Sequence, residues 1–122
     1  MESATPAGLC FVTFVDNDLI HLEGANGSWR RWLRDAGLEV SWWRGGVPFA
    51  QRDAADLGDF LPKMATLARL GVCFAEDYKQ GMAPADIMRD LQERGLLRQP
   101  FVAVSWGGPK GRLRIRHDPP AG

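Results

Sequence analysis

The sequence has few of the residues and motifs from which catalytic and metal sites are commonly built. It contains two histidines and two cysteines among 122 residues. It has no paired C-x-x-C, no H-E-x-x-H and no Walker-type phosphate loop. The G-x-G-x-x-G and G-x-S-x-G patterns are also absent. None of the enzyme or nucleotide-binding classes defined by these motifs is therefore indicated, and we predict neither a cofactor nor a metal.

Long hydrophobic runs are lacking too, and neither sign of charge dominates. No apolar stretch approaches the roughly 20 residues that span a bilayer. Lys plus Arg and Asp plus Glu number 15 each, so the net charge is zero. The first residues carry no basic segment followed by an apolar one, so we expect no secretion signal and a cytoplasmic location. Nothing in the overall charge requires a polyanionic partner.

The two cysteines, Cys10 and Cys73, each lie in a short apolar run. Free cysteine in such a setting behaves as a small hydrophobic residue of the core. We therefore expect both thiols to be reduced and buried, and neither to be a catalytic nucleophile.

Length and composition indicate a single domain over residues 1–122, with loose tails at 1–8 and 118–122. Hydrophobic residues make up 45% and charged residues 25%, which is typical of a globular chain. Residues 9–15 and 19–23 flank the turn residues Asp16, Asn17 and Asp18 and predict a hairpin. Residues 101–106 and 112–117 predict a second hairpin at the other end of the sequence.

Helical spacing dominates the middle of the sequence. Apolar residues three and four apart predict helices over 29–36, with Ser28 as N-cap, and over 60–80, with Asp59 as N-cap. A third helix begins at Pro84 and is closed by Gly95, with Leu96 in the contact that follows the cap. Residues 38–43 alternate and predict a strand. The fold class is α+β: two layers, a mostly antiparallel sheet, and about three helices on one face.

One polar cluster invites a functional interpretation. Asp16, Asp18, His21 and Glu23 fall in and after the first turn, where a histidine and carboxylates could bind a divalent metal or exchange protons. No second histidine or cysteine stands nearby in the sequence to complete a ligand set. We therefore favour a polar turn followed by the solvent face of a strand.

Tryptophan is abundant, with five in the sequence. Trp42 and Trp43 are adjacent, so in a strand they would face opposite sides of the sheet. Trp42 shares its side with Leu38 and Val40 and is expected in the core, which leaves Trp43 at a surface or an interface. An exposed tryptophan beside Arg44 is typical of a binding hot spot. The alternative is that both faces of the sheet are covered within the chain. Trp106, at the end of its strand, joins these candidate binding residues.

A basic stripe closes the sequence. Arg112, Arg114 and Arg116 share one face of the predicted last strand and could meet phosphates or an acidic partner. The structural alternative is an edge strand that its charges protect against aggregation. We favour this alternative, since a pI near 6.7 is far from the values typical of nucleic-acid binders.

Three functional hypotheses follow. The first is a non-enzymatic binding or protein-interaction module, most simply a homodimer, with a small-molecule ligand as a further option. The second is a nucleic-acid or polyanion binder acting through Arg112, Arg114 and Arg116. The third is a small enzyme or metal protein centred on His21. We identify no resemblance to a known family in the sequence.

Overall fold

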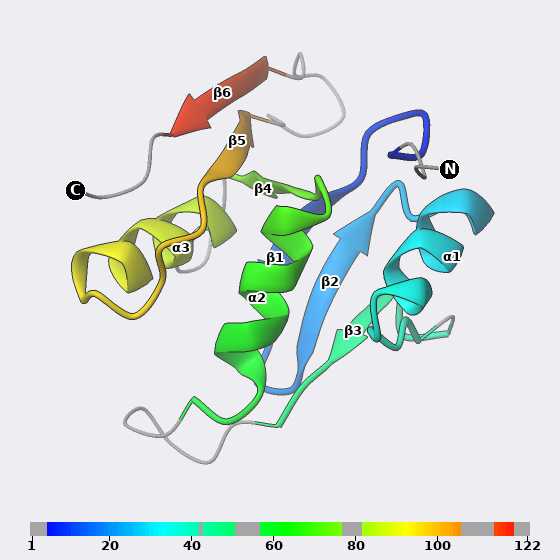
Figure 1. Cartoon of the computed structure of the whole chain (residues 1–122), viewed down its shortest axis with the longest axis horizontal. Helices are drawn as coiled ribbons and strands as arrows, with labels where there is room; N and C mark the ends of the chain where they lie inside the picture. Colours follow the sequence, from blue (N-terminus) through cyan, green and yellow to red (C-terminus); the bar gives the residue numbers. More distant parts are fainter. Residues whose placement is uncertain (1–4, 42, 51–56, 77–81, 106–113, 119–122) are drawn as a thin grey trace.

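The computed structural model describes residues 5–41, 43–50, 57–76 and 82–105 in full, and residues 114–118 as backbone. This part of the chain forms six strands and three helices (Figure 1). They are β1 (Phe11–Val15), β2 (Leu19–Glu23), α1 (Gly27–Asp35), β3 (Gly46–Pro48), α2 (Phe60–Arg69), β4 (Cys73–Ala75), α3 (Pro84–Glu93), β5 (Phe101–Ser105) and β6 (Arg114–Asp118). No helix among these residues is long and apolar enough to cross a membrane.

The strands form one mixed sheet in the order β3-β2-β1-β4-β5-β6. Three of its pairings are antiparallel: β1 with β2, β2 with β3, and β5 with β6. In the centre, β4 runs parallel to both β1 and β5. The α+β class and both terminal hairpins are thus confirmed, while the parallel centre was not predicted.

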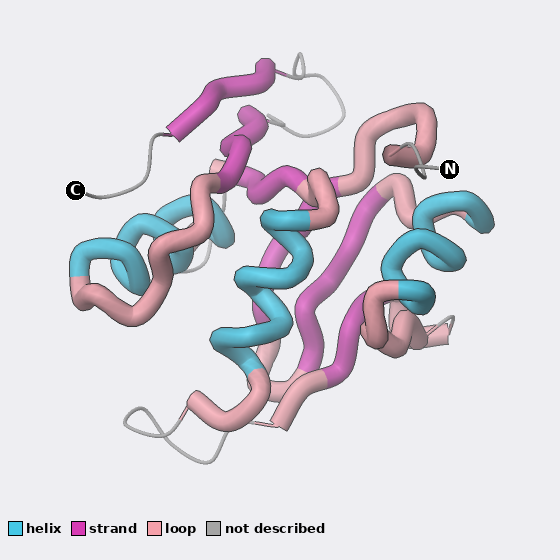
Figure 2. The backbone as a smooth tube through the Cα atoms, viewed as in Figure 1, coloured by secondary structure: helices cyan, strands magenta, loops and turns pink. Residues whose placement is uncertain are grey.

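The three helices share a core with one face of this sheet. One buried cluster contains residues from all three helices and from the strands. Its helical members include Trp29 and Leu33 of α1, Met64 and Leu67 of α2, and Met88 and Leu91 of α3, and its strand members include Val12, Ile20 and Phe74. Figure 2 shows α2 in the middle, with α1 and α3 to either side. The residues that alternate with these in the central strands form a second cluster on the opposite face: Phe11, Cys73, Ala75 and Val104.

The long helix predicted over residues 60–80 is wrong in its second half. The helix α2 ends at Arg69, and Gly71 then takes a φ of +95°, which favours glycine. Cys73–Ala75 becomes the central strand β4, and residues 77–81 lie outside the described part. A parallel strand that is buried on both faces has no polar alternation, so its apolar run continued the helical pattern without a visible break. Gly71 is exposed, although the predicted helix over residues 60–80 would have placed it on the apolar face.

The predicted strand over residues 38–43 is also wrong. Leu38 lies just after α1, in the turn that ends the helix, where its N–H donates to the carbonyl of Leu33. Ser41 makes only an isolated bridge to Gly46, and residues 43–45 form a turn. The strand in this region is β3, which begins at Gly46. A Cβ at that position would collide with the carbonyl oxygen of Ile20, so glycine allows the chain to pair closely with β2.

The helix ends agree with the sequence in part. Asn26, not Ser28, caps α1: its Oδ1 accepts the N–H of Trp29 at 3.0 Å. Asp59 occupies the N-cap position of α2 without a capping hydrogen bond from its side chain. Helix α3 begins at Pro84 as predicted, but Leu96 is 43% exposed, and Leu97 is the residue buried after it. In the last hairpin Asp118 belongs to β6, not to a tail.

Candidate functional site

The turn at residues 43–45 presents the most exposed large hydrophobic side chain in the described part of the chain. Trp43 is 87% exposed, as predicted, although it owes this to a turn and not to strand alternation. The guanidinium carbon of Arg44 lies 6.0 Å from the centre of the Trp43 ring, within cation–π range. Its predicted counterpart, Trp42, lies outside the described residues.

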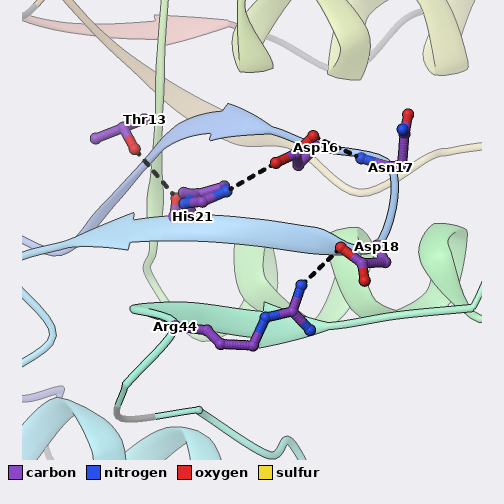
Figure 3. A network of polar contacts seen from close by, with 6 residues as sticks. All are labelled: Thr13, Asp16, Asn17, Asp18, His21 and Arg44. Atoms are coloured by element: carbon purple, nitrogen blue, oxygen red, sulfur yellow. Dashed lines mark hydrogen bonds and ion pairs between the residues drawn. The ribbon is translucent and has the colours of Figure 1, made fainter.

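Arg44 is fixed at its other side by the β1–β2 turn. Its Nη2 donates to Oδ1 of Asp18 at 2.7 Å (Figure 3). The backbone supports the same junction, since the N–H of Leu22 donates to the carbonyl of Gly45. The turn that carries Trp43 is therefore tied to the neighbouring hairpin. Trp43 and Arg44 thus lie side by side in the structure, and their role in binding stays a prediction.

The polar cluster around His21 is divided in the structure. Asp18 turns to Arg44, whereas Oδ2 of Asp16 lies 3.6 Å from Nε2 of His21 (Figure 3). The imidazole stacks on the ring of Phe14, with centroids 3.7 Å apart. No group of three or more potential metal ligands occurs among the residues that the structure describes. His21 therefore packs against Phe14 and has the carboxylate of Asp16 nearby.

Cys10 and Cys73 are both free and buried, as predicted. They lie on adjacent chain segments, and the N–H of Cys73 donates to the carbonyl of Cys10 at 3.0 Å. Cys10 belongs to the core beneath the helices, whereas Cys73 belongs to the cluster on the opposite face. Burial raises the pKa of Cys10 to about 12, with the nearby Cys73 adding to the rise, and burial also raises the pKa of Cys73. Both thiols are therefore suited to packing and not to nucleophilic attack.

Of the three arginines in the predicted stripe, the structure describes the backbones of two, Arg114 and Arg116. Trp106 and Arg112 are outside the described residues. Arg114 and Arg116 belong to β6, where their backbones pair with Ser105 and Ala103. Strand β6 is last in the sheet order, as the edge-strand interpretation expected. Binding through this stripe stays a prediction.

A cavity next to the Trp43 turn was not predicted. Its volume is about 530 Å³, and it lies between the end of β2, the start of α1 and the segment 40–45. Its polar lining residues are Glu23, Asn26, Arg30 and Ser41, and its apolar ones include Leu9, Leu22, Ala25 and Val40. These residues come from stretches far apart in the sequence, 8–9, 22–30 and 40–45, so no local motif predicts the cavity. A second hollow, of about 390 Å³, shares Val40 and Ser41 with this cavity.

Glycine 24 shapes this cavity. It follows Glu23 directly and has a φ of +82°. A Cβ there would collide with the carbonyl oxygen of Leu9. The chain therefore passes close to Leu9 at this point, and both residues line the cavity. Among the residues that line the cavity, Gly24 is the one whose structural role the sequence could have predicted, because it stands between a predicted strand and a helix cap.

No known protein family, curated protein or solved structure matches the chain. The candidate site consequently depends on its own geometry: an exposed aromatic turn, an arginine that contacts both Trp43 and Asp18, and a cavity beside them.

Proposed function

We propose that the protein is a non-enzymatic binding module that holds a protein partner on the turn of Trp43 and Arg44. A second copy of the chain is the partner we put forward first. The observation that carries the proposal is the 87% exposure of Trp43 beside an arginine that is itself anchored. Tryptophan and arginine are the residues most enriched at binding hot spots.

The energetics of this turn suit a contact between proteins. A tryptophan ring offers a large apolar area and one N–H donor, so its burial by a partner is favourable. The ion pair with Asp18 orients Arg44 before a partner packs on it, which reduces the side-chain entropy lost on binding. The exposed ring therefore costs little to bury and has a fixed polar neighbour.

The two buried thiols support a cytoplasmic location for the protein, which is a second part of the proposal. Cys10 and Cys73 are free and buried. Free thiols are typical of reducing compartments, and their raised pKa makes them poor nucleophiles. We accordingly place the module in the cytoplasm and assign the cysteines to packing.

The test is the variant Trp43→Ala. We expect it to keep the far-UV circular dichroism and melting temperature of the wild type, because an 87% exposed side chain contributes little to the core. Self-association should weaken by on the order of 2 kcal/mol, or roughly 30-fold in Kd. Sedimentation equilibrium over a wide concentration range measures this change.

Met82→Ala is the matched control. Met82 is also an exposed large hydrophobic residue, at 54%, but it precedes α3 and lies outside the turn. Its loss should leave self-association unchanged. A wild type that stays monomeric at every concentration would exclude a second copy as the partner. Unfolding of the Trp43→Ala protein would show that Trp43 serves the fold and not binding.

A further inference from the structure

We propose that β6 joins two copies of the chain, by antiparallel pairing of β6 with itself across a two-fold axis, in the register that sets Arg114 opposite Asp118. Strand β6 is the last of the sheet, and β3, which follows the Trp43 turn, is the first (Figure 1). This inference goes beyond the proposed function, because the new contact lies at the other edge of the sheet and does not use Trp43.

The edge of the sheet at β3 is closed to a further strand. The N–H of Ser41 donates to the carbonyl of Gly46 at 2.7 Å, and the N–H of Gly46 donates to the carbonyl of Ser41 at 3.3 Å. Pro48 is the next residue on this outer side, and it has no N–H. Its carbonyl accepts a hydrogen bond from Nζ of Lys63 at 2.6 Å. An added strand would therefore find no backbone partner at β3.

The edge at β6 is different, because two of its residues direct their backbone groups outward. The carbonyl of Val104 accepts the N–H of the residue after β4, so Val104 faces β4. Its neighbour Ala103 then faces β6 and its partner there, Arg116. Since successive residues of a strand alternate in this respect, Ile115 and His117 direct their N–H and C=O groups away from β5. No strand lies beyond β6 in the part of the chain that the structure describes.

The sequence of β6 is complementary to itself in one antiparallel register. With Ile115 opposite His117 of the other copy, both outward-facing residues can exchange backbone hydrogen bonds across the axis. Arg114 then stands opposite Asp118, and the two-fold symmetry repeats this pair of opposite charges. Arg116 stands opposite its own counterpart at the axis, which is the one unfavourable pair. Charge complementarity therefore favours a second copy as the occupant of this edge.

The charges also disfavour other registers. A shift by one residue sets an outward-facing residue opposite one that faces β5. A shift by two in one direction sets Arg114 opposite Arg116 and leaves no pair of opposite charges within the five residues of β6. The same shift in the other direction sets Pro119, which has no N–H, opposite Ile115. The charges that protect this edge against general aggregation thus permit one specific partner.

The experiment is sedimentation equilibrium of the full chain in the Trp43→Ala background, which removes the contact of the proposed function. We expect this protein to dimerise reversibly as its concentration rises. Adding Arg114→Asp or Asp118→Arg should weaken the dimer roughly 10-fold, because each change sets like charges opposite each other at both symmetric positions. The two changes together restore opposite charges and should return the Kd to within about threefold of the background.

Arg98→Asp is the matched control. Arg98 is exposed, precedes β5 and lies outside β6, and its reversal changes the net charge as much as Arg114→Asp does. It should leave the dimer unchanged. Hydrogen exchange gives a second measurement with β6 intact: the amides of Ile115 and His117 should become more protected as the concentration rises. The amide of Arg116, which faces β5, should be protected at every concentration.

Several outcomes would overturn the proposal. A Trp43→Ala protein that stays monomeric, while the wild type dimerises, would exclude the β6 contact and leave the proposed function in place. A dimer that Arg114→Asp leaves unchanged or tightens would exclude this register, as would a combined swap that stays as weak as the single changes. If a charge variant loses the circular dichroism of the folded chain, hydrogen exchange decides: protection of Ile115 and His117 that is independent of concentration would overturn the contact.

Discussion

Cys10 and Cys73 are one backbone hydrogen bond apart and yet face opposite sides of the sheet. In both, burial disfavours the thiolate, and the pKa of Cys10 rises to about 12. The folded protein therefore holds the Cys10 proton more tightly than the unfolded chain does. This difference in pKa stabilises the fold fully at pH values below the unfolded pKa of about 9. This stabilisation is lost as the pH rises from about 9 toward 12.

We predict that native Cys10 reacts with a thiol reagent at pH 8 roughly 1,000-fold more slowly than the unfolded chain does. Cys73 should also be slow. The measurement is the time course of labelling with and without guanidinium chloride, followed by mass spectrometry. Both thiols should label promptly once the chain is unfolded. Rapid labelling of the native protein, or a mass that shows a disulfide, would contradict the core assignment.

At the candidate site, the sequence predicted the exposure of one residue but not the contacts between residues. Trp43 was predicted at a surface or an interface, and it is exposed in the structure. The prediction relied on a strand over residues 38–43 that does not form, so the exposure was predicted correctly for a wrong reason. The ion pair of Arg44 with Asp18 joins residues 26 positions apart. Long-range contacts of this kind have no signature in local sequence spacing.

At the scale of elements, a small polar cluster joins the end of β3 to the start of α2. Oδ1 of Asp59 accepts the N–H of Ala50 at 2.6 Å, and its Oδ2 lies 2.8 Å from Nζ of Lys63. Lys63 also donates to the carbonyl of Pro48 at 2.6 Å. The pKa of Asp59 is lowered, first by its hydrogen bond with Lys63. Asp59 therefore connects two elements instead of capping one helix.

Replacement of this carboxylate should be visible in the pH dependence of stability. A lowered pKa in the folded state stabilises the fold above the unfolded value of about 3.8, and this contribution is lost as the pH falls through the folded value. We predict that Asp59→Asn lowers the melting temperature at pH 7 by roughly 2–5 °C. The difference from the wild type should narrow as the pH falls below about 4. Thermal melts between pH 3 and pH 7 measure this.

Asp90→Asn is the control for that experiment. Asp90 pairs with Arg94 at 3.6 Å within a single helix, and both side chains are 47% exposed. Exposed pairs of this kind contribute little, so its removal should shift the melting temperature less than Asp59→Asn does. Equal shifts in the two variants would mean that Asp59 acts as an ordinary surface charge.

Elements with partners nearby in the sequence were predicted well. Both hairpins and α3 carry their own turn and cap residues, and each formed as predicted. Strand β3 is three residues long, Gly46–Pro48, and has no strand pattern; it exists because β2 offers an edge. Strand β4 likewise depends on β1 and β5 for its pairing. Such elements are set by tertiary contacts, which a local pattern does not contain.

At the scale of the whole molecule, β4 joins the two halves of the chain. It pairs with β1 from the first half and with β5 from the second. Phe74 at its centre is fully buried and meets the ring of Phe101 edge-on, with centroids 5.8 Å apart. The same core includes residues from all three helices. A defect at Phe74 should therefore weaken the entire domain and not one element.

We predict that Phe74→Ala lowers the free energy of unfolding by roughly 3–5 kcal/mol, through lost burial and the cavity left behind. Because β4 links both halves, the loss should appear in one cooperative transition. Denaturant titration followed by far-UV circular dichroism and by tryptophan fluorescence should give coincident curves. Phe14→Ala is the control, since Phe14 is only half-buried and stacks on His21. A loss below about 1 kcal/mol for Phe74→Ala, or two separate transitions, would contradict a single core organised around β4.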